Sequence, residues 1–345
     1  MRKAFSARFA LAVAATLFLT MSFAVPASAS SRANFIGAWA GNSPSDWTTA
    51  NKTSQIGPLQ TEKDWSFPNS KPFRTLPPSF HDTACYKIYV ATPSHNPICL
   101  IAYKDTVNGK IDNSNLKSFV MSIPPNHAPV IMMFFMEPDV TLWQYNCHVV
   151  STAKPPYTSG TQYVQELEAQ STLIRQYAQQ AGLTNVKVAS GSGIASYYSD
   201  TGAGCGGKDY YGFDCSFIPP PAYVDHYFTE VYHPQLILLQ NDQRFQKWDS
   251  CTRGKGRSRG ISDYALGVCL PGGGTFTETD RATVMGKDAA YLAKTFKTLY
   301  MWQYWWFHVP TNPQKCVNYR FPAASSTSPQ TADEWQAIEA GTVPS

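Results

Sequence analysis

The chain has 345 residues and a formal net charge of +4, which falls to +1 when Arg2, Lys3 and Arg8 are set aside. Because the excess basicity belongs to the first few residues, it gives no reason to expect a nucleic-acid partner. At this length, with 43% hydrophobic residues, the chain can bury the core of one large domain or of two small ones.

The N-terminus has the pattern of a secretory signal peptide, which we assign to residues 1–29. The sequence is apolar from Phe9 to Val25, and Ala27-Ser28-Ala29 supplies a small-residue cleavage signal. A membrane anchor is the alternative, but the apolar run is short and no basic stop-transfer cluster follows it. No second stretch is apolar enough to span a bilayer. We therefore expect a secreted, extracellular protein that is free of the membrane once the signal is removed.

Eight segments have the pattern of β-strands, and three have that of helices. The expected strands are residues 34–39, 86–90, 98–103, 129–136, 186–190, 223–232, 259–265 and 300–307. The expected helices are residues 115–121, 162–180 and 281–299, the second of them ended by Gly182 as a C-cap. Strands that alternate with helices imply a parallel sheet. About eight of them predict an α/β fold, a (β/α)₈ TIM barrel, with a doubly wound sheet as the alternative.

No linker divides the chain. We therefore expect a single barrel domain with loop insertions over residues 30–322, followed by a C-terminal tail over residues 323–345. We expect a monomer.

Eight cysteines in an exported chain predict disulfide bonds. The best single pairing is Cys205 with Cys215, which would close a short glycine-rich loop. No C-x-x-C motif occurs and the seven histidines are scattered without ligand spacing, so zinc is not expected. Nothing in the sequence implies another metal or an organic cofactor. The eight are Cys85, Cys99, Cys147, Cys205, Cys215, Cys251, Cys269 and Cys316.

One junction stands out along the chain. The apolar run 129–136 ends abruptly in Glu137-Pro138-Asp139. A strand buried on both faces tolerates an acid only where it opens into a pocket, and proline blocks further pairing. In a parallel barrel the carboxyl ends of the strands hold the chemistry. Glu137 is therefore the first candidate for a functional residue, although it could instead pair with a helix, and Asp139 could simply cap the following loop.

The same strand-end rule selects a set of acidic and aromatic residues. An acid that protonates a leaving oxygen and a second carboxylate are what glycoside cleavage requires, and aromatic faces bind sugar rings. Each residue could instead have a purely structural role. Asp263 could cap a turn, Glu230 could face the helices, and the aromatic side chains could belong to the core. The set is Glu230, Tyr232, Asp263, Trp302 and Trp305.

Four short motifs, in this order and spacing, resemble clan A glycoside hydrolases and family 26 in particular. Residues 129–139 are similar to the fourth-strand motif that holds the acid/base. Residues 218–232 resemble the sixth strand with its lead-in, residues 260–265 the seventh-strand motif with the nucleophile, and the tryptophan-rich segment from residue 300 the eighth strand. The resemblance covers roughly residues 35–307, and it implies a TIM barrel that hydrolyses a β-linked polysaccharide of the mannan, xylan or glucan type.

The resemblance also implies roles for individual residues. Glu137 would be the acid/base and Asp263 the nucleophile of a retaining mechanism, and Tyr232 would donate a hydrogen bond to that nucleophile. Trp302 or Trp305 would form a wall against the sugar. The chain departs from the family pattern at two positions.

Met136 stands where the family has histidine, and Asp263 stands where it has the longer glutamate. A shorter nucleophile widens the gap between the carboxyl groups, from about 5–5.5 Å in retaining enzymes toward the roughly 6.5–9.5 Å of inverting ones. An alternative function is therefore a catalytically impaired barrel that binds carbohydrate or serves the cell envelope.

Two other patterns in the sequence suggest binding sites only weakly. Residues 202–207 satisfy the G-x-G-x-x-G spacing, but cysteines surround them and no helix follows, so nucleotide binding is not expected. Arg253, Lys255, Arg257 and Arg259 could suggest an anionic partner. They precede a strand, which places them at the bottom of the barrel, and we read them as a solvated loop.

Overall fold

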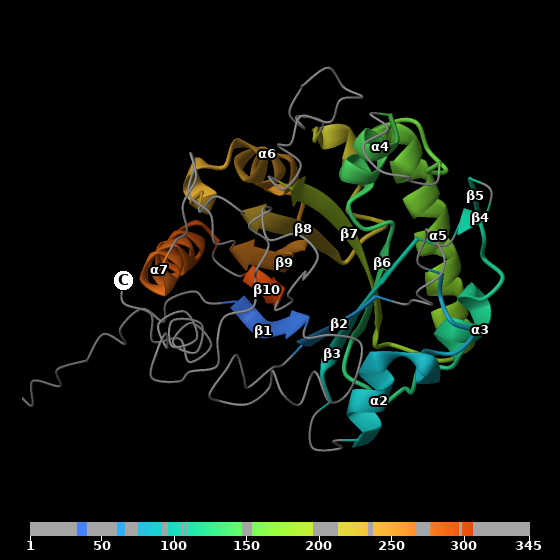
Figure 1. Cartoon of the computed structure of the whole chain (residues 1–345). Helices are drawn as coiled ribbons and strands as arrows, with labels where there is room; N and C mark the ends of the chain where they lie inside the picture. Colours follow the sequence, from blue (N-terminus) through green and yellow to red (C-terminus); the bar gives the residue numbers. More distant parts are fainter. Residues whose placement is uncertain are drawn as a thin grey trace, which may run out of the picture.

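Figure 1 shows the computed structural model of the chain, a curled sheet with helices around it. The structure describes residues 33–39, 61–65, 75–91, 96–104, 106–107, 109–146, 154–195, 213–233, 237–266, 277–296 and 299–305. The expected signal peptide and C-terminal tail lie outside these residues.

Eight parallel strands form the sheet, and its two edges meet. The order around the ring is β1, β10, β9, β8, β7, β6, β3, β2. β2 meets β1 through the single register pair Ala38↔Glu62. The strands are β1 (Ala33–Trp39), β2 (Thr61–Trp65), β3 (Ile98–Tyr103), β6 (Val130–Phe134), β7 (Val186–Ala195), β8 (His226–His233), β9 (Ser258–Leu266) and β10 (Leu299–Trp305). A separate antiparallel pair joins β4 (Thr106–Val107) to β5 (Lys110–Ile111).

Helices connect most successive strands and cover the outside of the sheet. Figure 1 shows α2 to α5 along one side of it and α6 and α7 along the other. The helices are α2 (Ala84–Ala91), α3 (Leu116–Met121), α4 (Pro138–Asn146), α5 (Gly160–Gln180), α6 (Gln243–Thr252) and α7 (Glu278–Thr295), with 3₁₀ turns η1 (Phe80–Asp82), η4 (Cys215–Phe217) and η5 (Leu239–Asn241). Among the described residues, no helix is long and apolar enough to cross a membrane.

Alternation along the strands divides the core into an inner and an outer layer. Ile98, Leu100 and Ala102 of β3 join a small cluster inside the ring, which also contains Met133 and Phe228. Their neighbours in the chain, such as Cys99 and Ile101, belong to the larger cluster between the strands and the helices. Burial on both faces explains why β3 and β6 read as continuous apolar runs.

The predicted helix over residues 162–180 is confirmed as α5. Ser159 caps its start, because the side chain accepts a hydrogen bond from the N–H of Gln162 at 3.2 Å. Gly182 lies just past its end with φ 68°, and the Leu183 N–H bonds back to the Ala178 carbonyl at 2.8 Å. Gly182 therefore ends the helix as predicted.

Several predicted elements need correction. The strand expected at 86–90 is part of α2, and the second strand of the ring is β2, which the sequence did not indicate. The apolar run 129–136 is a strand only as far as Phe134, and Pro138 begins α4 instead of an irregular loop. Proline is well suited to that position, because the first N–H of a helix has no partner within the helix.

Two disulfides lie within the described residues. Cys85–Cys99 joins α2 to β3, and Cys215–Cys251 joins η4 to α6. The predicted pairing of Cys205 with Cys215 is therefore wrong, since Cys215 is bonded to a partner on α6. Cys147, Cys205, Cys269 and Cys316 lie outside the described residues.

Candidate functional site

The backbone around Glu137 is held in an uncommon conformation. Phe135 and Glu137 have φ values of 51° and 54°, and no other non-glycine residue of the described chain has a positive φ. Each such residue costs about 1–3 kcal/mol, so surrounding contacts must fix it. The N–H of Phe135 bonds to the Tyr103 carbonyl at 2.7 Å, and that of Glu137 bonds to the Gly191 carbonyl at 3.0 Å. These bonds anchor the turn to both neighbouring strands.

Two glycines of β7 leave the room that this turn needs. A Cβ atom at Gly193 would lie 3.1 Å from the Cβ of Glu137 and 2.4 Å from a methyl carbon of Val140. A Cβ atom at Gly191 would lie 2.3 Å from the sulfur of Met133. Any larger residue at either position would displace these side chains. The partly exposed Glu137 side chain therefore lies against a part of β7 where the glycine carries no side chain.

Asp139 fastens the start of α4 to the same strand. Its carboxylate accepts a hydrogen bond from the Gly193 N–H at 2.8 Å, and the residue is 2% exposed. The Tyr157 hydroxyl donates to the Pro138 carbonyl at 3.0 Å. Asp139 therefore fixes the position of the segment that carries Glu137, which is more than the loop-capping role considered from the sequence.

On β8, Phe228, Glu230 and Tyr232 point into the ring. Phe228 belongs to the inner cluster, and residues two apart in a strand share a face. The Tyr232 hydroxyl lies 3.4 Å from a carboxylate oxygen of Glu230, which requires both on one side of the strand. The possibility that Glu230 faces the helices is therefore wrong.

A bulge in β9 brings Asp263 opposite Glu230. The register runs Thr229↔Ile261 and then Glu230↔Asp263, so Ser262 is an extra residue. The Tyr232 hydroxyl donates to Asp263 Oδ2 at 2.7 Å, and the Ser262 hydroxyl lies 3.5 Å from Glu230. Glu230 and Asp263 are both 0% exposed. Two carboxylates directly opposite each other repel, which makes the hydroxyl donors important.

The charges of three acids converge on one hydroxyl group. Burial raises the pKa of Tyr232 well above its usual value, and the negative charges of Asp263, Glu230 and Glu137, in that order, raise it further. Tyr232 is therefore held as a neutral hydrogen-bond donor. The structure thus brings together four of the residues selected from the sequence: Glu137 from the turn after β6, Glu230 and Tyr232 from β8, and Asp263 from β9.

The two tryptophans of the predicted set are placed differently. Trp302 is 2% exposed and belongs to the outer cluster, where its ring meets that of Tyr264 edge-on at 5.2 Å. This placement favours a role in the core over contact with a sugar. Trp305 ends β10, and its side chain lies outside the described residues.

Sequence reasoning missed Lys104, which directly follows β3. Its ammonium group donates to the Thr141 hydroxyl at 2.7 Å and lies 5.7 Å from the centre of the Phe135 ring. A positive charge therefore stands beside the turn that carries Glu137. The strand-end rule, applied to the predicted strand 98–103, would have selected it.

One group of the described residues has the spacing of metal ligands. Atoms of Cys85, Cys99 and His127 lie within 4.8 Å of one another. The two cysteines are joined in a disulfide, so they offer no thiolate to a metal.

No family model and no curated protein matches this sequence. Solved structures do match. GH26C from Muricauda sp. MAR_2010_75 has 11% identity and a TM-score of 0.52, over 90% of this chain and 86% of that one. A triple mutant of the endo-beta-1,4-glucanase Xac0030 from Xanthomonas axonopodis pv. citri has 11% identity and a TM-score of 0.53, over 89% and 99%. At this level of identity the similarity shows a shared fold alone; the neighbours are TIM-barrel glycoside hydrolases.

Proposed function

We propose that this protein is a secreted glycoside hydrolase of the family 26 type that cleaves a β-linked polysaccharide by a retaining mechanism. The observation that carries the proposal is the Tyr232 hydroxyl, bonded to Asp263 at 2.7 Å and within the field of Glu230 and Glu137. Acids from three neighbouring segments around one donor include the pair of carboxyl groups that glycoside cleavage needs. The proposal includes a complete (β/α)₈ barrel over residues 30–322, a monomer, and no cofactor.

In the first step, Glu137 gives its proton to the glycosidic oxygen as the bond to the anomeric carbon breaks. A carboxylate oxygen of Asp263 forms a bond to that carbon, which gives a covalent glycosyl-enzyme. In the second step, Glu137 takes a proton from water, whose oxygen attacks the same carbon and releases Asp263.

Tyr232 and Glu230 support the nucleophile. Tyr232 donates to one oxygen of Asp263 and so orients the carboxylate, and the other oxygen is proposed to attack the anomeric carbon. Glu230 accepts hydrogen bonds and is proposed to bind a hydroxyl of the substrate. The indole of Trp305 is proposed as the sugar-facing wall.

The second candidate function is a carbohydrate-binding barrel without catalysis. Two observations favour it: Asp263 is 0% exposed, whereas an attacking carboxylate must reach the anomeric carbon, and Met136 fills the position of the family's histidine. Such a protein would bind the same polysaccharide and leave it intact.

Sugar release from mannan, xylan and mixed-linkage glucan separates the two candidates. For the wild type we expect reducing ends from one of these polymers. For Glu137→Gln we expect a loss of about 10²–10⁴-fold, because general acid–base catalysis contributes that much. Binding to a polymer in affinity electrophoresis without any sugar release would favour the second candidate. A Glu137→Gln variant as active as the wild type would refute the role of Glu137.

A further inference from the structure

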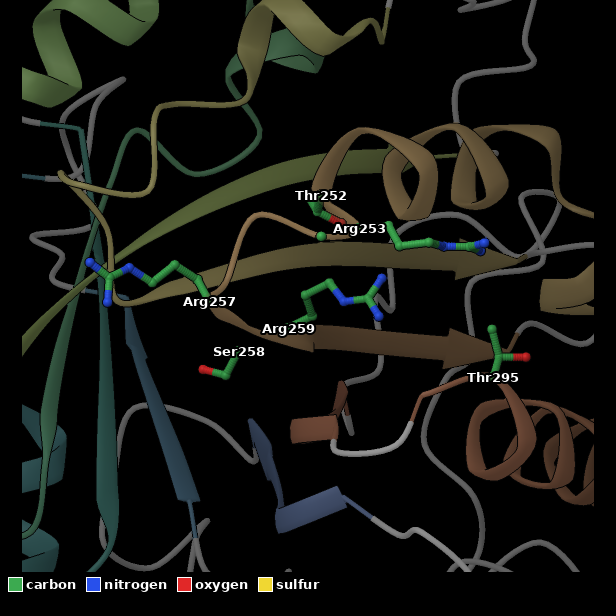
Figure 2. A pocket seen from close by; sticks show the side chains of 7 residues that line it. Thr252, Arg253, Arg257, Ser258, Arg259 and Thr295 are labelled. Atoms are coloured by element: carbon green, nitrogen blue, oxygen red, sulfur yellow. The ribbon is translucent and has the colours of Figure 1, made fainter.

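A cavity of about 400 Å³ opens at the start of β9 (Figure 2). We call it the arginine pocket, because Arg253, Arg257 and Arg259 are among the residues that line it. Its wall is the loop between α6 and β9, together with Thr295 at the end of α7. The predicted bottom-face position of this basic stretch is therefore confirmed, but it is not simply a solvated loop.

Each of the three guanidinium groups is fixed on one side by the protein. Arg253 and Arg259 bind the two different carboxylate oxygens of Asp249. Arg259 also lies over the ring of Phe296, 4.4 Å from its centre. Arg257 donates from Nε to the Pro221 carbonyl at 2.7 Å. Since these bonds use only some of the five donors of each guanidinium, the others remain for a ligand, and little entropy is lost when it binds.

The positive charge around the arginine pocket is larger than the nearby acid and helix ends neutralise. Residues 249–259 carry four basic side chains and one acid, Asp249, a net formal charge of +3. α6 and α7 both end here, at Thr252 and Thr295, and each helix end contributes about half a negative charge. About two positive charges therefore remain at the pocket.

The arginines point in two directions. In Figure 2, Arg253 and Arg259 extend to the same side, whereas Arg257 extends the opposite way. One small ion cannot contact both groups. A chain with repeated negative groups can place one at each.

We propose that the arginine pocket binds an acidic polysaccharide, a sugar chain that bears carboxylate or sulfate groups. Guanidinium groups bind both oxyanions through paired hydrogen bonds. The preference for a sugar chain over a nucleic acid rests on the proposed function, whereas the preference for a linear polyanion rests on charge and geometry alone.

Affinity electrophoresis at low salt tests the proposal, with polygalacturonate and dextran sulfate as carboxylate and sulfate probes and dextran as the neutral one. The test variant is Arg253→Gln/Arg257→Gln, which leaves Arg259 in place on Asp249. The control is Lys117→Gln/Lys287→Gln, an equal charge change on exposed side chains of α3 and α7. We expect one of the acidic polymers to retard the wild type and the control, and to bind the arginine variant about tenfold more weakly, because the variant loses two ion pairs on exposed side chains. Melting temperatures verify that both variants fold.

Three results would overturn the proposal: no retardation by either acidic polymer, equal weakening in both double variants, or arginine-dependent binding that is tighter to single-stranded DNA. The Glu137→Gln variant distinguishes a failure of this proposal from a failure of the proposed hydrolase function. It should bind the acidic polymer like the wild type, so a failed hydrolysis assay leaves the pocket assignment intact, and failed binding leaves the hydrolase assignment intact.

Discussion

At the scale of single residues, Tyr232 organises the candidate site. Its hydroxyl is the donor that separates Asp263 from Glu230, two fully buried acids on adjacent strands. A buried carboxylate without such a donor loses solvation that nothing replaces. Both the stability of the site and the orientation of Asp263 therefore depend on this oxygen atom.

Tyr232→Phe should lower the free energy of unfolding by about 1–3 kcal/mol, the cost of leaving a buried acceptor without its partner. It should also reduce hydrolysis, because Asp263 is no longer oriented. Tyr227→Phe is the matched control, since Tyr227 is on the same strand but points outward, with its hydroxyl on the Pro219 carbonyl at 2.8 Å. Urea unfolding and sugar release measure the two effects. Equal losses of activity in both variants would contradict the role of Tyr232.

At the scale of elements, the sequence predicted long and strongly patterned segments best. α5 has a cap and a continuous buried stripe, and β3 is uniformly apolar, so both are visible without tertiary information. Residues 86–90 read as a strand because Tyr, Ile and Val favour strands, but packing and the Cys85–Cys99 bond place them in a helix. β2, with the sequence TEKDW, carries no apolar pattern at all.

The candidate site could be predicted only in part, because some of its geometry depends on contacts between distant parts of the chain. Glu137 and Asp263 follow from the rule that strand ends meet at one mouth of a barrel. The bulge at Ser262 does not follow from the sequence, and it decides that Glu230 and Asp263 face each other. The contribution of Gly193 was also invisible, because its importance comes from a side chain more than fifty positions away.

Asp288 joins α7 to β9 and to η5. It accepts hydrogen bonds from the Tyr264 hydroxyl at 2.7 Å and the Leu239 N–H at 2.8 Å. Burial raises its pKa to about 6, and the charge of His233 and these hydrogen bonds oppose that rise. Since the pKa in the folded state exceeds that of the unfolded chain, the folded state binds the proton more tightly. This contribution to stability is complete below about pH 4 and is lost as the pH rises to about 6.

Asp288→Asn should remove this pH dependence of the free energy of unfolding, which amounts to about 3 kcal/mol between about pH 4 and pH 6. The measurement is the free energy of unfolding in urea between pH 4 and 7. Asp280→Asn serves as a comparison, because hydrogen bonds from Thr277 lower the pKa of Asp280, so its contribution has the opposite sign. If the free energy of unfolding of Asp288→Asn fell with pH as steeply as that of the wild type, Asp288 would not be the group responsible.

At the scale of the whole molecule, the two described disulfides close loops of different length. Cys215–Cys251 spans 36 residues and Cys85–Cys99 spans 14. A crosslink that closes a longer loop restricts the unfolded chain more.

Replacing both members of the Cys215–Cys251 pair by serine should cost about 4 kcal/mol, against about 3 kcal/mol for Cys85–Cys99, if chain entropy dominates. Urea midpoints of the two double variants measure the difference. A larger loss at Cys85–Cys99 would mean that the folded-state packing of α2 against β3 outweighs the loop length.

β9 carries one of the arginines of the pocket near its start and Asp263 further along, four residues after Arg259. A regular strand rises about 3.3 Å per residue and the bulge at Ser262 shortens that rise, so these two positions are fixed at a distance of at most about 13 Å. A polymer held at the lower rim therefore cannot present the same sugar unit to the upper mouth. A protein with both the proposed hydrolase site and the proposed polymer site would hold one segment or chain while cutting another, and the length of free polymer between them would limit which bonds it reaches.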